Sequence, residues 1–467
     1  MTEPIHETAQ HAAERLAVPG PWELFGQRLS RFELYADGLR TETVRGPLLI
    51  EGVGLRLFRP SPEGLGVGFQ ATTDLSEPGL RQLIEDAETT ARHARFPTPR
   101  VTLPTGAPRR PGGPRVEDPK LSGAPVETVR EYLEAVLSEC SRACDVAPSF
   151  GSVRATIAET TLVNSEGLSV GYRETFAELE LALKSVGTSR HDAAGEYWIT
   201  RALRRLDRST LTVDGPQWTT LARDVRRATA TPGGPLPVAL PAALLSEIVP
   251  SAIRLRFSGA GRLRKMAIPD GTPVAAAPVT LVRDPTVDWS VGSAPVDDEG
   301  AVPARLALVS GGKLEHLLYD ALHASAFDLP TNAAAGRAPD LAPSWRRFQG
   351  RPHPTTGTLA IEPGPDGTDE ELLEAIVDGV WIDQLGWPNP DGMSGSFGGE
   401  VRIGYRIRHG RLAEPIRGGT LGGLVFSASG EPSLLGSVRK LGSTARLEGS
   451  LVAPTLVTDG LTLSGPT

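Results

Sequence analysis

A break rich in proline and glycine divides the chain and limits where its elements can run. Residues 231–235 read Thr-Pro-Gly-Gly-Pro, and an apolar run interrupted by prolines follows over 236–241. Since both residue types interrupt helices and central strands, this is the best domain boundary in the sequence. Residues 244–251, Leu-Leu-Ser-Glu-Ile-Val-Pro-Ser, then predict a buried helix. We therefore expect two domains, residues 1–232 and 233–467.

Length and composition indicate a globular protein without a membrane span or a nucleic-acid partner. The 467 residues exceed the usual size of one hydrophobic core. No stretch approaches the roughly 18 apolar residues of a membrane helix, and the acidic N-terminus lacks the apolar region of a signal peptide. We therefore expect a cytoplasmic location. A formal net charge of −8 argues against binding to nucleic acid, which requires a basic surface.

The first half alternates in the manner of antiparallel strands. Residues 31–73 place apolar side chains at every second position between glycines, which is typical of a meander. Ser76 is placed to cap a helix with apolar positions from Leu80 to Ala91. Cys140 and Cys144, the only two cysteines, are too few for a disulfide framework and read as small buried residues on one helix. The remaining expected elements are helices near 6–16, 126–144 and 218–227, a surface connection over 104–125, and strands over 153–163, 168–172 and 176–185 with a hairpin turn at 164–167.

The second half predicts mostly strands with glycine turns. Two helices interrupt it, one over 313–327 and one that begins at Thr368 with Glu371 as its capping-box partner. The second of these is expected to bury Leu372, Leu373, Ile376 and Val377. The fold class predicted for the whole chain is α+β, with an N-terminal antiparallel sheet and helices followed by a strand-rich C-terminal domain.

The predicted helix at 244–251 has the spacing of a zinc site without its ligands. Histidines at positions 246 and 251 would give His-Glu-x-x-x-His, but Ser246 and Ser251 stand there and only Glu247 remains. A serine hydroxyl is a poor zinc ligand, and one carboxylate cannot hold the metal alone. We therefore expect no catalytic residue, metal ligand or cofactor in this chain, and Glu247 is expected to be a structural hydrogen-bond acceptor. Pro250 should remove a helix hydrogen bond and kink the helix.

Three other groups invite a functional interpretation, and a structural one is favoured for each. Asp297, Asp298 and Glu299 have the chemistry to bind Mg²⁺ or Ca²⁺, but neighbours on a strand point to opposite faces. His316 and His323 would lie about 10 Å apart on a helix, too far to share one ion. Neither Ser246 nor Ser251 has the glycine elbow of a nucleophile.

Several short segments of the second half, in this order, resemble one family. Gly395-Ser396-Phe397-Gly398 precedes a strand over 401–407, and together with the other segments it is similar to the TldD/PmbA (TldD/TldE) family of metallopeptidases. The resemblance covers nearly the whole chain, including the glycine-rich meander and the hairpin at 164–167. The other segments are Val291 to Gly300, Asn332 with Gly336-Arg337, Gly410 to Gly418, and Leu461 to Gly465.

The resemblance implies a division of labour between two kinds of subunit. The TldD kind carries His-Glu-x-x-x-His and a cysteine near the C-terminus as third zinc ligand, whereas residues 442–454 of this chain contain no cysteine. The chain therefore resembles the TldE (PmbA) kind, which implies a heterodimer that hydrolyses peptide or amide bonds. Zinc and the catalytic glutamate would belong to a TldD-like partner. This chain would complete the cleft and hold an extended peptide by strand addition.

Two alternatives stay open at this stage. One is a stand-alone hydrolase or biosynthetic enzyme with a site rebuilt around Glu247, which new polar residues facing that carboxylate would favour. The other is a non-catalytic homodimer that binds peptides, which stable self-association without a zinc-bearing partner would favour. The sequence leaves the substrate and the partner unidentified.

Overall fold

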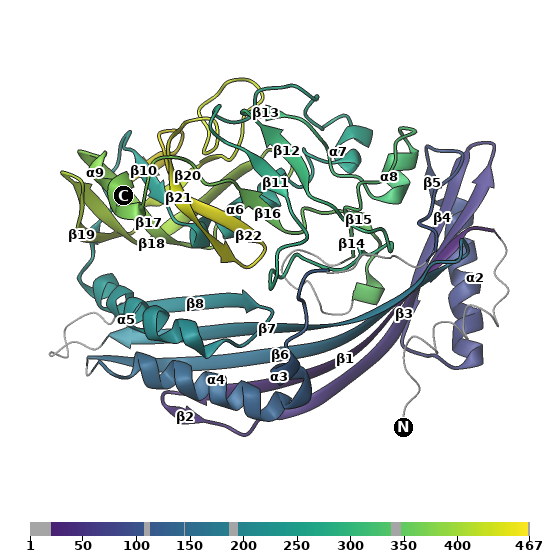
Figure 1. Ribbon diagram of the computed structural model, residues 1–467, viewed down its shortest axis with the longest axis horizontal. Coiled ribbons are helices and arrows are strands. Elements are labelled where there is room, and N and C mark those ends of the chain that lie inside the picture. Colours follow the sequence, from purple (N-terminus) through teal and green to yellow (C-terminus); the bar gives the residue numbers. More distant parts are fainter. Residues whose placement is uncertain (1–19, 107–112, 144, 186–194, 338–346, 466–467) are drawn as a thin grey trace.

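Two β-sheets and the helices around them form the fold in the computed structural model, which describes residues 20–106, 113–143, 145–185, 195–337 and 347–465. The first sheet is long and curved, and the C-terminal half lies over its concave side (Figure 1). The N-terminal sheet is antiparallel and the C-terminal half is rich in strands, so the α+β prediction is confirmed. The helix predicted near 6–16 and Cys144 lie outside the described residues.

The first sheet is an antiparallel sheet in the order β5-β4-β3-β1-β6-β7-β8, with β2 paired to β1. The hairpin predicted at 164–167 joins β6 to β7. The strands predicted over 168–172 and 176–185 are one strand, and Glu174, which lies between the predicted strands, is buried against two arginines. The strands are β1 Trp22–Asp37, β2 Arg40–Thr41, β3 Arg45–Ser61, β4 Gly64–Thr72, β5 Arg95–Phe96, β6 Val146–Asn164, β7 Ser169–Ser185 and β8 Gly195–Leu203.

Helices cover this sheet at both ends. As predicted, the Ser76 hydroxyl accepts a hydrogen bond from the Gly79 N–H, at 3.3 Å, and caps α2, Glu77–His93. The helix approaches β4 so closely that a Cβ on Gly68 would lie 1.9 Å from the Ala87 carbonyl oxygen. Cys140 is fully buried at the end of α4. The other elements are α3 Pro119–Gly123, which falls inside the expected surface connection, α4 Pro125–Cys140, η1 Arg208–Thr210 and α5 Leu211–Arg227, which begins earlier than predicted.

The second sheet is mixed, in the order β13-β12-β11-β16-β22-β10-β17-β18-β19-β9. Three of its pairs are parallel: β10 with β17, β16 with β22, and β19 with β9. The remaining strands, β20, β21 and β23, extend it through β18, β22 and β20 respectively. The strands are β9 Thr229–Ala230, β10 Val238–Leu240, β11 Leu281–Arg283, β12 Leu306–Ser310, β13 Lys313–Leu314, β16 Leu359–Ile361, β17 Asp378–Gly386, β18 Ser396–Arg408, β19 Arg411–Arg417, β20 Thr420–Leu424, β21 Val438–Glu448, β22 Leu451–Thr458 and β23 Thr462–Ser464, with β14 Ala335–Gly336 and β15 His353–Pro354 as a separate pair.

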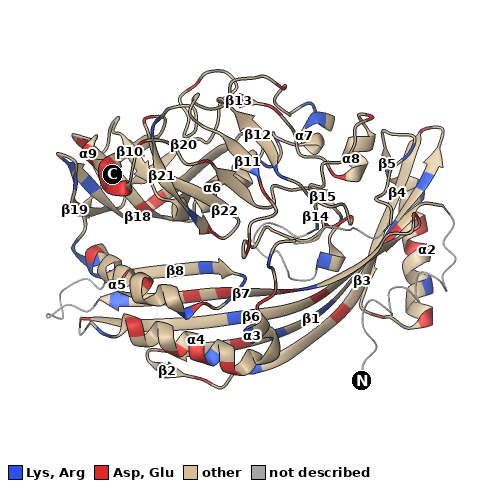
Figure 2. Cartoon of the chain, in the orientation of Figure 1, with Lys and Arg blue, Asp and Glu red and all other residues tan. Residues whose placement is uncertain are grey.

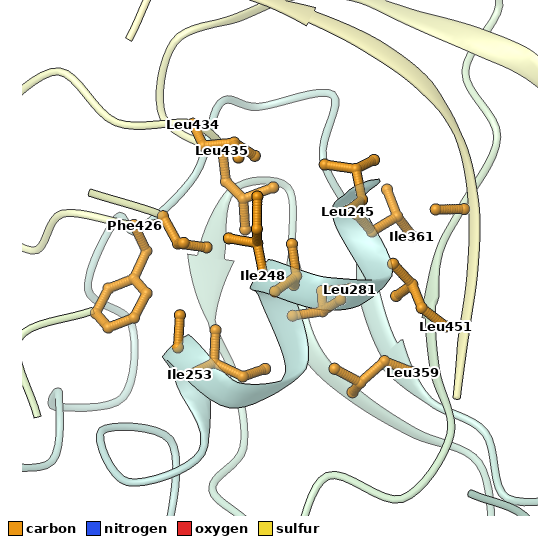
Figure 3. Close-up of a cluster of buried hydrophobic side chains, with 14 of the residues drawn as sticks. Leu245, Ile248, Ile253, Leu281, Leu359, Ile361, Phe426, Leu434, Leu435 and Leu451 are labelled. Carbon is orange, nitrogen blue, oxygen red and sulfur yellow. The ribbon is translucent and has the colours of Figure 1, made fainter. Parts of the chain in front are cut away.

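The predicted buried helix is α6, Ala242–Ile253, and it lies at the centre of the C-terminal core. Its apolar side chains contact residues from several strands and loops, as Figure 3 shows for Leu245, Ile248 and Ile253. The helix continues through Pro250 to Ile253. Burial on most sides fixes where the helix can lie, so the few polar residues on it have defined surroundings.

The helix predicted over 313–327 is wrong. The chain forms β13 at Lys313–Leu314, and α8, Ala321–Ser325, begins only after Asp320. Asp320 accepts the His323 N–H at 2.7 Å, so an aspartate cap sets a start that apolar spacing alone did not reveal. The remaining helical segments are α7 Gly259–Leu263, η2 Arg347–Gln349 and α9 Asp369–Glu374.

The capping box predicted for α9 is confirmed, with both Thr368 and Glu371 in their expected roles. The helix ends at Glu374, earlier than predicted, and Val377 lies beyond it with 73% of its side chain exposed. The expectation that Val377 is buried is therefore wrong. No helix of the described residues is both long enough and apolar enough to cross a membrane.

Buried ion pairs join the two halves of the molecule. Arg56 of β3 pairs with Glu23 of β1 at 2.7 Å and with Glu299 of the C-terminal half at 2.5 Å, and all three side chains are buried. Arg337 also pairs with Glu23, and Arg347 pairs with Glu174 of β7. Basic and acidic residues occur on elements of both halves (Figure 2). Three of these pairs cross between the halves, Arg56 with Glu299, Arg337 with Glu23 and Arg347 with Glu174, and they fix the C-terminal half on the sheet.

Candidate functional site

The three positions of the predicted degenerate site lie on α6 with different surroundings. Ser246 is half-buried, and its hydroxyl donates to the Ala243 carbonyl oxygen at 2.7 Å, back along its own helix. Ser251 is also half-buried, whereas Glu247 is exposed. The segment 442–454 belongs to β21 and β22, and both strands contact α6. The fold thus brings together the segments that the resemblance associates with three zinc ligands.

Charged and polar side chains from distant elements act electrostatically on Glu247. The Tyr197 hydroxyl of β8 donates to the Asp383 carboxylate of β17 at 3.1 Å. Arg201 of β8 pairs with Glu448 of β21. The pKa of Glu247 responds to the charges of both Arg201 and Asp383, which places the three groups in one electrostatic neighbourhood.

Burial raises the pKa of Glu247 to about 7, with Arg201 offsetting part of the rise and Asp383 adding to it. The exposed surface of Glu247 and its raised pKa are compatible, because a carboxylate can be reached by water and still be surrounded by protein at longer range. Burial also raises the pKa of Asp383 and holds that of Tyr197 well above its ordinary value. A carboxylic acid that titrates near neutrality can accept or donate a proton at that pH.

The acidic segment 297–299 forms a turn rather than the predicted strand, and its carboxylates take separate partners. Asp297 accepts the N–H groups of Glu299, Ala301 and Ala335, at 3.1, 2.8 and 3.1 Å. Asp298 pairs with Arg347 at 2.9 Å, and Glu299 pairs with Arg56. These contacts give the segment a structural role in joining the halves. No group of three or more His, Cys, Asp or Glu in the described part of the chain could hold a metal ion.

The two histidines predicted to share a helix face do not share one. His316 is exposed outside any helix, and its Nδ1 lies 2.9 Å from the Ala307 carbonyl oxygen. His323 lies on α8, where its Nδ1 is 2.7 Å from Asp320 and its ring packs edge-on to Phe96. Each histidine therefore has a local structural contact of its own.

Sequence reasoning found α6 but missed the groups that act electrostatically on Glu247. Tyr197 is buried between exposed neighbours on β8 and Arg201 is half-buried further along, and nothing in their spacing relates them to residue 247. Asp383 sits in a register irregularity of β17 opposite β18. In the sequence Asp383 directly follows the apolar residues 380–382, which indicates an unusual position but does not identify its partner.

Comparison with known proteins assigns the C-terminal half to a family and shows that the whole chain shares its fold with solved structures. Residues 233–465 match the family described as PmbA/TldA metallopeptidase C-terminal domain. An uncharacterized protein of Methanocaldococcus jannaschii is 20% identical over 66% of this chain and 68% of its own length. A protein of Haemophilus influenzae named metalloprotease TldD homolog is 24% identical over 42% of this chain and 39% of its own length.

The solved structure of TldE from Thermococcus kodakarensis has the same fold. It superposes with a TM-score of 0.76, covering 98% of this chain and 99% of that chain at 16% identity. The likeness extends over both sheets, so the N-terminal half also has the architecture seen in that protein. Through its C-terminal domain and the fold of the whole molecule, the chain belongs to the TldD/PmbA family of metallopeptidase-like proteins.

Proposed function

We propose that this chain is the non-catalytic, TldE-like subunit of a heterodimeric TldD/TldE-type zinc metallopeptidase that hydrolyses peptide or amide bonds. The observation that carries the proposal is the pair of serines, Ser246 and Ser251, at the ligand positions of α6. The Ser246 hydroxyl is directed to a carbonyl of its own helix, and residues 442–454 contain no cysteine. The zinc, its ligands and the catalytic glutamate would lie in the partner, where zinc activates water and polarises the carbonyl.

The edge strand β8 supports a role in holding substrate. It pairs with β7 on one side and is the last strand of the first sheet among the described residues. Its residues Tyr197 and Arg201 contact Asp383 of β17 and Glu448 of β21, and both of these strands pack against the helix that carries Glu247. An extended peptide can add to such an edge through main-chain hydrogen bonds. In this proposal the chain contributes a wall of the cleft and the partner contributes the reacting centre.

Co-expression tests the proposal. The chain is purified alone and together with a homologue from the same genome that carries His-Glu-x-x-x-His, and zinc content and peptide hydrolysis are measured for each. We expect the chain alone to contain no stoichiometric zinc and to be inactive, and the pair to co-purify with zinc and cleave peptides. Glu247→Gln should leave the activity of the pair nearly unchanged, whereas the equivalent change in the homologue should abolish it. Zinc or turnover with the chain alone contradicts the proposal.

A second candidate function follows from the surroundings of Glu247. Tyr197, Arg201, Asp383 and Glu448 bring new polar groups to α6, and a carboxylic acid with a pKa of about 7 suits general acid–base chemistry. The chain would then be a stand-alone hydrolase or biosynthetic enzyme with a rebuilt site. This candidate requires turnover by the chain alone, and that turnover should fall at least a hundredfold in Glu247→Gln. Self-association of an inactive chain, measured by light scattering, would instead support a peptide-binding homodimer.

A further inference from the structure

A small cavity beside α6 contains a buried arginine. The cavity has a volume of about 130 Å³, and Pro250 of α6 lines part of it. Arg283, the last residue of β11, also lines the cavity, and only 3% of its surface is exposed. Ser293, Asp297, Asp298 and Gly357 also line the cavity, together with three further arginines.

Most hydrogen-bond donors of Arg283 are unused. Its Nη2 donates to the Ala333 carbonyl oxygen at 2.6 Å, whereas Nε and Nη1 have no hydrogen-bond partner among the described residues. Those two nitrogens carry three of the five N–H groups of a guanidinium. Buried donors in native proteins almost always have acceptors, so unpaired ones need an explanation. The acceptor is expected in the cavity that the side chain lines.

The missing side chain of Gly357 leaves one edge of the guanidinium open. Gly357 has a φ of +57°, and a Cβ added there would lie 3.5 Å from Arg283 Nε and 3.6 Å from Nη2. Even an alanine would therefore occupy the space next to these nitrogens. Nearby, the hydroxyls of Ser293 and Thr358 are hydrogen-bonded to each other at 2.8 Å. The cavity thus combines an open cationic edge with small and hydroxyl-bearing residues.

Within the described part of the chain, no carboxylate forms a direct ion pair with Arg283. The other guanidiniums on this cavity already have carboxylate partners: Arg204 pairs with Glu174, Arg337 with Glu23, and Arg347 with Asp298. Asp297 is the nearest carboxylate in electrostatic terms, but its oxygens accept three backbone N–H groups. Burial lowers the pKa of Arg283 to about 10, so the guanidinium is still protonated at neutral pH.

We propose that this cavity binds a small monocarboxylate group, held by Arg283. A planar carboxylate matches the planar guanidinium. A phosphate dianion fits less well, because Asp297 and Asp298 also line the cavity and repel a second negative charge more strongly. A cavity of about 150 Å³ admits benzene, so one of about 130 Å³ holds a carboxylate with two or three further heavy atoms. The end of a peptide or an amino acid carries such a group. This inference does not rest on the proposed pairing with a zinc-bearing subunit.

Propionate and propionamide test the proposal, because they have nearly the same shape and differ in charge. Binding of each to the purified full chain is followed by ligand-observed NMR titration at constant ionic strength, with inorganic phosphate as a third probe. We expect saturable binding of propionate, and at least tenfold weaker binding of propionamide and phosphate. Arg283→Gln should weaken propionate binding at least tenfold. Arg81→Gln, which changes an exposed arginine on α2, should have no effect.

Gly357→Ala provides a second variant that keeps the charge and fills the space beside it. It should also weaken propionate binding at least tenfold, and it serves as the test if Arg283→Gln does not fold. Equal binding of propionate and propionamide would overturn the proposal, as would unchanged binding by either variant. Tighter binding of phosphate than of propionate would overturn the assignment to a carboxylate.

Discussion

Replacing Arg56 with methionine should show how firmly the two halves are joined. The Arg56 guanidinium is 1% exposed and contacts Glu23 of the first sheet and Glu299 of the C-terminal half. Methionine keeps much of the apolar volume and removes the charge. After the change, Glu23 still has Arg337, but among the described residues Glu299 keeps only the Ala321 N–H, at 2.6 Å. At a pH above its folded-state pKa, Glu299 would be a buried carboxylate without a cation, which typically costs about 3–5 kcal/mol.

A double-mutant cycle separates the ion pair from the packing of Arg56. Glu299→Gln removes the charge that Arg56 balances, so the double variant should recover more than about 1 kcal/mol of the loss. The free energy of unfolding is measured by urea titration, followed by both tryptophan fluorescence and far-UV circular dichroism, because coincident curves are needed for a two-state analysis. Arg81→Met breaks an exposed pair with Glu77 and should cost at most about 0.5 kcal/mol.

The pH dependence of this variant has a definite sign. Burial and neighbouring carboxylates raise the pKa of Glu299 above its ordinary value, and Arg56 opposes that rise. Without Arg56 the pKa of Glu299 rises further, so the folded variant holds this proton to higher pH than the wild type does. The loss of stability in Arg56→Met should therefore grow as the pH rises through the folded-state pKa of Glu299. A loss below about 1 kcal/mol, without coupling to Glu299 and independent of pH, would refute this reasoning.

Three further changes test the fold and the site. Ile248→Ala removes a fully buried side chain of α6 and should lower the free energy of unfolding by about 2–5 kcal/mol in a urea titration, so a loss below 1 kcal/mol would contradict its place in the core. Thr368→Ala removes the cap of α9, where Thr368 Oγ1 accepts the Glu371 N–H at 3.4 Å. It should lower the free energy of unfolding by about 0.5–1 kcal/mol in the same titration, and no change would mean that the capping box does not stabilise α9. The pKa of Glu247 is raised from 4.5 to about 7 in the folded protein, so the contribution of this residue to stability should fall as the pH rises through that range. Glu247→Gln should remove this fall, which is measured by comparing melting temperatures at pH 5 and pH 8. Identical pH dependence of the wild type and Glu247→Gln would show that this carboxylate does not titrate in that range.

Local signals predicted the elements whose ends are set by their own residues. The Ser76 cap, the turn at 164–167 and the Thr368 capping box were confirmed because each depends on contacts within a few residues. The helix predicted over 313–327 failed because Asp320 caps a shorter helix and the preceding apolar residues pair with other segments. The two strands predicted over 168–172 and 176–185 form one strand, in which arginines from distant segments bury Glu174.

The site was predictable only in part, for a related reason. The spacing of Ser246, Glu247 and Ser251 depends on one helix and could be read directly, and their interpretation as a degenerate metal site stays a prediction. Arg201 and Asp383 influence the charge of Glu247 from β8 and β17, whose places in the two sheets cannot be read from their separation in the sequence. Arg283 follows two apolar residues in a short strand, and only the surrounding fold shows that two of its nitrogens lack acceptors among the described residues.

The point at which the C-terminal half begins is also the point to which it returns. The Gly234 N–H donates to the Leu463 carbonyl oxygen at 3.0 Å, and β9 lies just before this contact, paired with β19. The segment from 234 to 463 therefore leaves the first half and comes back at one place. Segments with adjacent ends tolerate circular permutation and exchange between relatives. An exchange of residues 234–463 as a unit would therefore leave all strands of the first sheet, β1 to β8, in one continuous segment.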